Sequence, residues 1–330
     1  MNIKFSVIMP CYNSELWVKN ALDSIKNQTY PHWELIVVND GSKDNTPDIL
    51  NEYAESDERI KVFSKENGGY VSAVNYGLDK ITGDYFLFLG SDDVLDTGLF
   101  EEFYDNICKI SFIPDVINFR TVKVIDGEKH GIDKYTSFET TMYSNDSSLK
   151  EYSEKYPEHS LSLFVRDTSK CFKTSVLGEL RYFGKYGIDA DGIFSMLFCR
   201  KSKSFLSIPY NGYFWTLRSD SVSATTSSEK NIDRINNWIL FYEELIKSGV
   251  TDSDNLADQE KSYINTMLAT ITKTCWSIKN SFRYYGFLRR SAKKAKEIAL
   301  KFAPDKLKKT TTIISISPVL FSILYSIRKM

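Results

Sequence analysis

The chain has little of what a disulfide-linked or thiolate-metal protein needs. Its 330 residues include five cysteines, and no two of them form a CxxC pair. They stand far apart, at Cys11, Cys108, Cys171, Cys199 and Cys275. An odd number of scattered cysteines predicts neither a disulfide framework nor a zinc site and favours a reducing compartment. The chain also has only three histidines, which argues against a histidine metal site or a nucleophilic triad.

Long apolar runs are also lacking. Residues 313–327 are the most apolar part of the C-terminal region, but they contain Pro318 and several serines. Such a segment is too short and too polar to cross a bilayer core of about 30 Å, which takes roughly 20 apolar residues. The N-terminal residues lead directly into an apolar strand without a basic region and cleavage site, so we expect no secretion signal. These features predict a cytoplasmic protein.

Charge is distributed unevenly, although the formal net charge is only −1. Residues 1–150 carry 14 basic and 25 acidic groups, whereas residues 283–330 carry 12 basic and 2 acidic groups. The C-terminal region is therefore a separate electrostatic unit. A basic segment (283–309) beside an amphipathic apolar one (313–327) is typical of an anchor that lies on an anionic membrane surface. The alternatives are packing on the protein's own body or a homodimer contact. We expect no nucleic acid partner.

Hydrophobic residues make up 42% of the chain, enough for a full core. Short apolar runs predict buried strands, and helical spacing of apolar residues predicts helices between them. The expected strands are 4–10, 33–38, 60–63 and 84–89, and the expected helices begin near Asn13, Asp44 and Tyr70. Strands that alternate with helices of about ten residues predict a parallel sheet with right-handed crossovers. From Glu229 onward the spacing is helical throughout.

Polar clusters follow these apolar runs. The clusters are Pro10–Asn13, Asn39–Ser42, Asn67–Gly69 and Gly90–Asp93. In a parallel α/β sheet they fall at the carboxyl ends of the strands, where such sheets bind ligands. Their order resembles the family-2 glycosyltransferases, which have the GT-A fold and use nucleotide-sugars, here of the type that builds bacterial cell-surface polysaccharide.

The resemblance implies a Rossmann-like, mostly parallel sheet flanked by helices, followed by a C-terminal helical extension. It divides the chain into a nucleotide-sugar-binding half (1–110), an acceptor-binding and catalytic half (111–225) and the extension (226–330). The clusters near the strand ends would then form the donor site. The implied nucleotide-binding residues are Pro10, Cys11, Tyr12, Asn13, Asp40, Asn67, Gly68, Ser91 and Asp92.

Two of these residues have alternative explanations. The ring of Tyr12 would stack on the nucleobase, or it would simply be an aromatic residue at a strand end. The carboxylate of Asp40 would accept a hydrogen bond from the base, or it would form an Asx turn with Gly41 and Ser42. Asp40 could form the Asx turn and bind the base at the same time.

The resemblance also implies a Mg²⁺ or Mn²⁺ ion on the diphosphate, held by Asp92 and Asp93. Hard carboxylate oxygens suit both ions, which complete their coordination with phosphate and water. The family's first motif carboxylate is replaced here by Gly90, and an arginine common in relatives is replaced by Val74. The alternative is that Asp92 and Asp93 only cap the next helix.

The implied catalytic base is Asp191, in Asp189-Ala190-Asp191 at the predicted start of a helix, where relatives have a Glu-Asp pair. A helix N-cap role for Asp189 or Asp191 is the alternative. The following aromatic strand supplies Trp215 and Arg218 as expected acceptor-side residues. The function implied is inverting transfer of a sugar, with UDP the expected nucleotide, to a glycan or lipid-linked acceptor hydroxyl at the inner face of the membrane.

Two other functions compete with this one. A sugar nucleotidyltransferase shares the general architecture, but it typically has a Gly-rich loop and a lysine after the first strand, and Pro10–Asn13 supply neither. A catalytically degenerate GT-A domain that serves as a partner subunit would explain the replacements at Gly90, Val74 and Ala190.

Overall fold

The computed structural model describes most of the chain. The described residues are 2–125, 127–132, 141–144, 167–184, 187, 189–217, 228–250, 284–302, 315, 317 and 318. Outside them lie the expected acceptor-side residue Arg218, much of the stretch 126–160, residues 264–282 of the predicted helical region and most of the tail segment 313–327.

The first part of the chain alternates strands and helices as predicted. Its elements are β1 (Phe5–Cys11), α1 (Val18–Lys26), β2 (Trp33–Asn39), α2 (Thr46–Ser56), β3 (Ile60–Ser64), α3 (Tyr70–Leu78), β4 (Tyr85–Phe88), β5 (Val94–Leu95) and α4 (Leu99–Lys109). The central strands β2 and β4 are buried along their whole length. This burial explains why their sequences are continuous apolar runs rather than alternating ones.

The second part adds strands to the same sheet and then continues as helices. Its elements are β6 (Val116–Ile125), β7 (Glu128–Ile132), β8 (Thr141–Ser144), β9 (Lys170–Lys173), α7 (Thr174–Leu177), α8 (Ala190–Lys201), β10 (Ser204–Leu217), α9 (Ser228–Lys247) and α12 (Tyr285–Phe302). The expected aromatic strand that carries Trp215 is the second part of the long strand β10, which has register shifts near Asn211.

One ten-stranded sheet joins both halves, in the order β3-β2-β1-β4-β9-β6-β10-β5, with β7 beside β6 and β8 beside β10. The pairs among β1 to β4 are parallel, as predicted. The second half is mixed, because β9 lies antiparallel between β4 and β6. The predicted α/β class with flanking helices is confirmed, but the sheet as a whole is mixed, and every antiparallel pair includes at least one strand of the second part.

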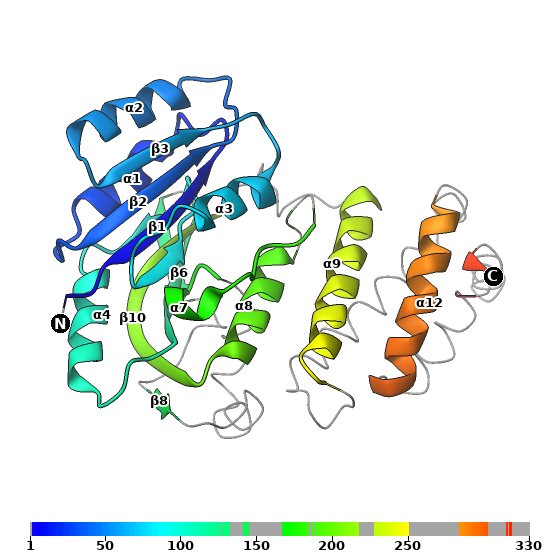
Figure 1. The fold of residues 1–330 in the computed structure, drawn as a ribbon. Coiled ribbons are helices and arrows are strands. Elements are labelled where there is room, and N and C mark those ends of the chain that lie inside the picture. The colour runs from blue at the N-terminus through cyan, green and yellow to red at the C-terminus, as the bar shows by residue number, and fades with distance from the viewer. Residues whose placement is uncertain are drawn as a thin grey trace.

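Helices cover both faces of the sheet (Figure 1). Residues of α1, α2 and α4 share one core with the sheet. Residues of α3, α8, α9 and α12 share a second core with it. In Figure 1 the helices α8, α9 and α12 follow one another outward from the sheet, and α9 contacts both α8 and α12.

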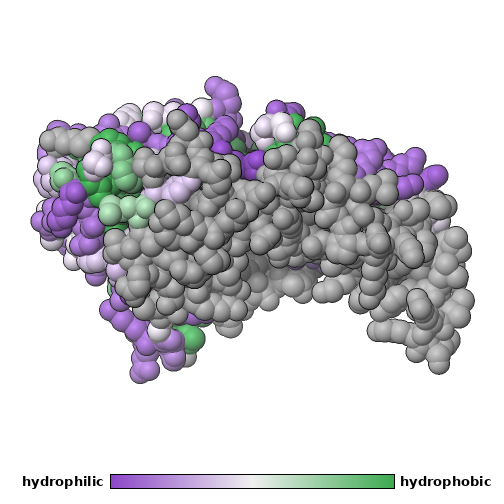
Figure 2. Space-filling view, turned by 90° about the horizontal axis from the view of Figure 1, so that it is seen from below, coloured by the Kyte–Doolittle hydropathy of each residue, from purple (hydrophilic) through white to green (hydrophobic). Residues whose placement is uncertain are grey.

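The helical extension presents a basic outer surface. Helix α12 buries the small and apolar residues Leu288, Ala292, Ala295 and Ile298 in the second core. Its basic residues Arg289, Arg290, Lys293 and Lys294 are exposed, and Figure 2 shows hydrophilic residues at this end of the molecule. This part of the basic tail therefore packs on the protein's own body, which is one of the alternatives to a membrane anchor stated above. No helix in the described residues is both long and apolar enough to cross a membrane.

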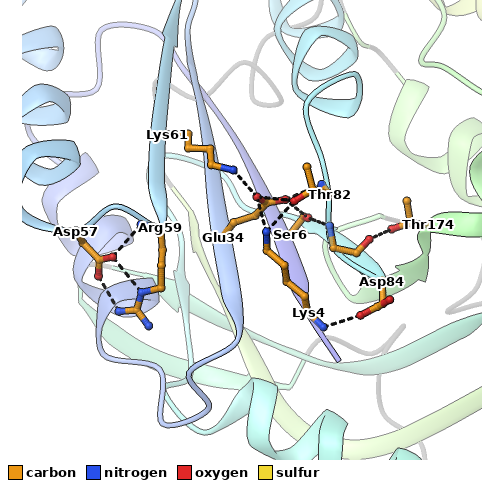
Figure 3. A network of polar contacts seen from close by, with 10 residues as sticks. Lys4, Ser6, Glu34, Asp57, Arg59, Lys61, Thr82, Asp84 and Thr174 are labelled. Atoms are coloured by element: carbon orange, nitrogen blue, oxygen red, sulfur yellow. Dashed lines mark hydrogen bonds and ion pairs between the residues drawn. The ribbon is translucent and has the colours of Figure 1, made fainter. Parts of the chain in front are cut away.

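A buried carboxylate links the strands at their amino-terminal ends, which lie opposite the ends that carry the polar clusters (Figure 3). Glu34 of β2 accepts hydrogen bonds from Ser6 Oγ at 2.7 Å and from the Thr82 backbone at 2.6 Å. It also forms ion pairs with Lys4 at 2.9 Å and Lys61 at 2.8 Å. Burial alone would raise the pKa of Glu34, but these hydrogen bonds outweigh it and lower the pKa to about 2. The network fixes the mutual positions of β1, β2, β3 and the turn before β4.

Candidate functional site

Asp40 organises the loop that precedes α3. Its Oδ1 accepts hydrogen bonds from Lys65 Nζ at 2.7 Å and the Gly68 amide at 3.0 Å. Its Oδ2 accepts one from the Gly69 amide at 2.7 Å. The carboxylate is almost fully buried and is therefore held firmly. Because Oδ2 has one donor among the described residues, it retains capacity for a second donor such as a nucleobase N–H.

Two backbones approach each other closely beside Asp40. Gly41 has a φ of +73°, and a Cβ atom there would lie 2.9 Å from the Asn67 amide nitrogen. Only glycine combines this left-handed conformation with such an approach. The segment Asn39–Ser42 and the Asn67–Gly69 loop, both predicted from the sequence, thus form one structure.

The end of β1 supplies the neighbouring surface. Tyr12 is 50% exposed, so its ring is accessible for stacking. Asn13 adopts φ 48° and is tied to the next loop, since its amide donates to Ser42 Oγ at 3.0 Å and its Oδ1 accepts from the Lys43 amide at 2.8 Å. Cys11 is buried, and burial raises the pKa of its thiol far above the ordinary value. The thiol is therefore neutral and buried, and it lies next to Ser91 of the Gly90–Asp93 loop.

Asp93 is a buried carboxylate with donors on both oxygens. Tyr213 Oη donates to Oδ2 at 2.6 Å, and the Thr216 amide donates to Oδ1 at 2.8 Å. The same tyrosine oxygen accepts a hydrogen bond from the Gly90 amide at 3.0 Å. Strand β10 therefore fixes the loop that carries Asp92. This arrangement suits Asp93 as a helper that positions the loop rather than as a direct metal ligand.

Gly90 leaves room for two carboxylates. A Cβ atom on Gly90 would lie 2.6 Å from Asp93 Oδ2 and 3.0 Å from Asp92 Oδ1. Two carboxylate oxygens thus converge over Gly90, at the position where a side chain of the family's first motif carboxylate would begin, and Asp92 Oδ1 is the candidate metal ligand of the two. The described residues contain no group of three or more His, Cys, Asp or Glu side chains that could hold a metal alone. The arrangement fits an ion that takes one or two protein oxygens and completes its shell with phosphate and water.

Asp191 lies in the first turn of α8, and Asp189 precedes it in a left-handed conformation, φ 58°. Asp189 does not cap the helix with its side chain. Instead it accepts hydrogen bonds from Arg234 Nε at 2.8 Å and Trp238 Nε1 at 3.0 Å, both from α9. The extension thereby holds the segment that leads into Asp191.

Ring contacts place the start of α8 at the same sheet edge as Asp92. The rings of Phe194 and Phe88 are 5.6 Å apart, and those of Phe198 and Phe86 are 6.0 Å apart. Helix α8 therefore runs antiparallel to β4. Its N-terminus projects beyond the carboxyl end of β4, where the Gly90–Asp93 loop begins.

The hydroxyl of Tyr70 feels the charges of several acidic groups of the site. Desolvation, and after it the charges of Asp167, Asp191, Asp93 and Asp92, raise the pKa of Tyr70 well above its usual value. Asp167, Asp191, Asp93 and Asp92 are thus the described acidic groups whose charges act on this hydroxyl, although 41% of the whole Tyr70 residue is exposed. Its ring lies over Gly187, where a Cβ atom would be 2.9 Å from Tyr70 Cδ1.

The remaining predicted residues have the following positions. Ser91 is linked through its hydroxyl to Ser14 at 2.7 Å, and Asn67 and Gly68 are exposed. Trp215 is partly buried on β10, next to Thr216. The replacements Val74 and Ala190 are both buried in the second core.

The sequence did not reveal several residues of this site. Lys65, which pairs with Asp40, looked like one of many surface lysines. Tyr213 looked like a core aromatic, and Arg234 lies far from Asp189 in the sequence. Long-range pairing of this kind leaves no local pattern, although a tyrosine opposite a predicted acidic loop is a usable signal once the sheet order is known.

Comparison with known proteins agrees with this geometry. The model of the family "Glycosyl transferase family 2" matches residues 6–170. The glycosyltransferase GlyA of Streptococcus pneumoniae is 31% identical over 67% of this chain and 31% of its own length. The minor teichoic acid biosynthesis protein GgaB of Bacillus subtilis is 32% identical over 79% of this chain and 27% of its own. The chain thus spans less than a third of the length of either relative.

A solved structure has the same fold. Residues 1–349 of S. aureus TarS, in complex with UDP-GlcNAc, give a TM-score of 0.69 at 19% identity and cover 97% of this chain and 89% of that one. At this identity the likeness concerns the fold. The family model covers half of the chain, and the chain therefore belongs to glycosyltransferase family 2.

Proposed function

We propose that this chain transfers a sugar from a nucleotide-diphosphate donor, UDP-sugar in the first instance, to a hydroxyl of a glycan or lipid-linked acceptor. The observation that carries the proposal is the meeting of three groups at one edge of the sheet. These groups are the Asp40-centred loops beside Tyr12, the Asp92 loop over Gly90, and Asp191 at the start of α8. A donor bound there would extend from its base at Tyr12 to its sugar near Asp191.

In the proposed reaction Asp191 acts as a general base. A carboxylate oxygen of Asp191 takes the proton of the acceptor hydroxyl. The acceptor oxygen forms a bond to the anomeric carbon while the bond from that carbon to the diphosphate oxygen breaks, which inverts the configuration and releases UDP. Asp189 is held by Arg234 and Trp238, which fixes the segment that leads into Asp191.

A divalent ion, Mn²⁺ or Mg²⁺, fits the oxygens of Asp92 over Gly90, with Asp93 as the helper that positions the loop. When bound, the ion would neutralise the negative charge that develops on the leaving diphosphate. The contribution of this chain is to hold the loop rigid through Tyr213 and Thr216.

The choice of UDP is supported by the UDP-GlcNAc complex of TarS. A role in surface polysaccharide synthesis is supported by the relative named for minor teichoic acid biosynthesis. We further propose that the exposed basic residues of α12 draw the protein to anionic membrane surfaces, where lipid-linked acceptors are present.

The test is calorimetric titration with UDP in the presence of Mn²⁺ and in the presence of a chelator. We expect tighter binding with the ion, and we expect Asp92→Ala to abolish this difference while leaving metal-independent binding unchanged. Asp96→Ala serves as the matched control, because Asp96 belongs to the same loop region but accepts a hydrogen bond from Tyr210 instead. Equal UDP affinity with ion and chelator in the wild-type protein would refute the metal assignment. UDP-sugar hydrolysis that is absent under all conditions would favour the degenerate domain.

A further inference from the structure

Asp167 is a buried acidic residue that the proposed reaction does not use. It is 1% exposed. In the described part of the chain, no side chain donates a hydrogen bond to either of its carboxylate oxygens, and the backbone amides of Asp167 and Thr168 are its nearest donors. A buried carboxylate without a partner is expensive when ionised, so such a group usually keeps its proton instead. An acid kept in this state calls for an explanation.

The sheet register places Asp167 beside the site. Phe172 of β9 pairs with Phe86 of β4 in antiparallel register, which puts Lys170 opposite Phe88. The turn closed by the Lys170 amide and the Asp167 carbonyl, 3.1 Å apart, then reaches the carboxyl end of β4. Helix α8 begins at that same end, as its phenylalanine contacts show.

The charged and titratable groups around Asp167 come from three elements. Desolvation and then the charge of Asp191 on α8 raise the pKa of Asp167 well above its ordinary value. The fully buried Lys170 on β9 and, after it, the backbone amides of Asp167 and Thr168 lower this pKa by smaller amounts. Tyr70 on α3 is the third group, since the charge of Asp167 acts on its hydroxyl. The two carboxyl groups therefore cannot both be ionised at low cost.

We propose that Asp167 is a positioning residue for the base: it keeps a proton inside the protein, so that the negative charge of the pair resides on Asp191. The inference rests on the proposed role of Asp191. The assignment within the pair follows from location. Asp191 lies in the first turn of a helix, where the helix dipole favours a negative charge, and it is only partly buried, whereas Asp167 has neither advantage. Ionisation of Asp167 at high pH would place a second, unpaired charge beside the base.

The decisive experiment follows the protonation of Asp167 directly. Infrared spectra of protein with ¹³C-labelled aspartate, compared with those of Asp167→Asn, identify the acid band of Asp167. We expect this band in the wild-type protein at neutral pH. In Asp191→Asn, where the neighbouring charge is gone, the midpoint of its titration should move down by about one pH unit or more. An ionised Asp167 at neutral pH, or an unchanged midpoint, would overturn the inference.

Enzyme kinetics provide the second readout. Asp167→Asn imitates the protonated acid, so transfer at neutral pH should stay within about threefold of wild type, while the fall in kcat/KM at alkaline pH should disappear or move up. Tyr70→Phe is the control: it removes the tyrosine hydroxyl that also titrates in this cluster, and it should retain that fall.

A pH profile of Asp167→Asn that superimposes on the wild-type profile contradicts the inference. If Asp191→Asn transfers sugar normally, the proposed function fails. The infrared titration would still show whether the charge of Asp191 affects the protonation of Asp167. Should Asp167→Asn not fold, the Asp191→Asn titration reports on the native Asp167.

Discussion

Replacing Glu34 by glutamine should destabilise the fold in a pH-dependent way. The side chain of Glu34 is 1% exposed, and its pKa is lowered from 4.5 to about 2. A difference of this size corresponds to about 3 kcal/mol of unfolding free energy at neutral pH. The lysine partners Lys4 and Lys61 keep 38% and 43% of their side-chain surface exposed, so they regain water in the variant and add little to the cost.

The sign follows from the lowered pKa. The contribution is fully present above about pH 4.5, the value for the unfolded chain, and it is lost as the pH falls to about 2. For a chain of 330 residues, about 3 kcal/mol corresponds to a Tm difference of about 4 °C between wild type and Glu34→Gln. This difference should shrink progressively below pH 4.5.

The assay is thermal unfolding of both proteins at a series of pH values, recorded as the difference in Tm. Asp79→Asn is the control, because Asp79 forms an ion pair with Arg181 in which its side chain is 57% exposed. Exposed pairs contribute about 1 kcal/mol or less, so its Tm should change by about 1 °C or less. A Glu34→Gln difference that stays constant as the pH falls from neutral through the acidic range would refute the linkage reasoning.

Three further outcomes are expected. Asp191→Asn should bind UDP as wild type does but transfer sugar two to four orders of magnitude more slowly, about the range of a positioned general base, as measured by product formation; turnover within tenfold of wild type would remove its role. Tyr213→Phe should weaken Mn²⁺-dependent UDP binding by about 1 to 3 kcal/mol in calorimetry, because Asp93 loses its 2.6 Å donor, while binding in chelator should stay the same. Arg289→Glu combined with Arg290→Glu should reduce co-sedimentation with anionic liposomes but not affect neutral ones; equal sedimentation would leave α12 as a packing element only.

The sequence was most informative where the chain is locally periodic. Buried runs such as Trp33–Asn39 follow from period and composition alone, so the strands of the alternating half were predicted to within one or two residues, whereas α1 begins at Val18 rather than near Asn13. The second half could not be predicted in this way, because the position of β9 between β4 and β6 depends on pairing across more than 80 residues, from Phe86 to Phe172. No local pattern encodes that choice.

The site divides in the same way. The sequence predicted that residues at the ends of β1, β2 and β4 would meet. The bonds from the Asn13 amide to Ser42 and between Ser14 and Ser91 join the end of β1 to the ends of β2 and β4, while the Asp40 bonds join the ends of β2 and β3. The sequence did not predict which acidic side chains would be held by other parts of the protein. The bonds from Arg234 to Asp189 and from Tyr213 to Asp93 exist only in the folded chain. The binding roles themselves stay predictions until ligands are measured.

The replacements at Gly90, Val74 and Ala190 bear on whether this is a degenerate domain. A site that had lost its function would be expected to keep acidic residues only where they are solvated, because a buried carboxylate without a purpose costs stability. Here Asp93 is buried and satisfied on both oxygens, and its oxygen occupies the space that a side chain at position 90 would need. Val74 and Ala190 lie in the apolar core that seats α8 on the sheet. Each replacement is therefore matched by its surroundings, which favours an altered but working site over a decayed one.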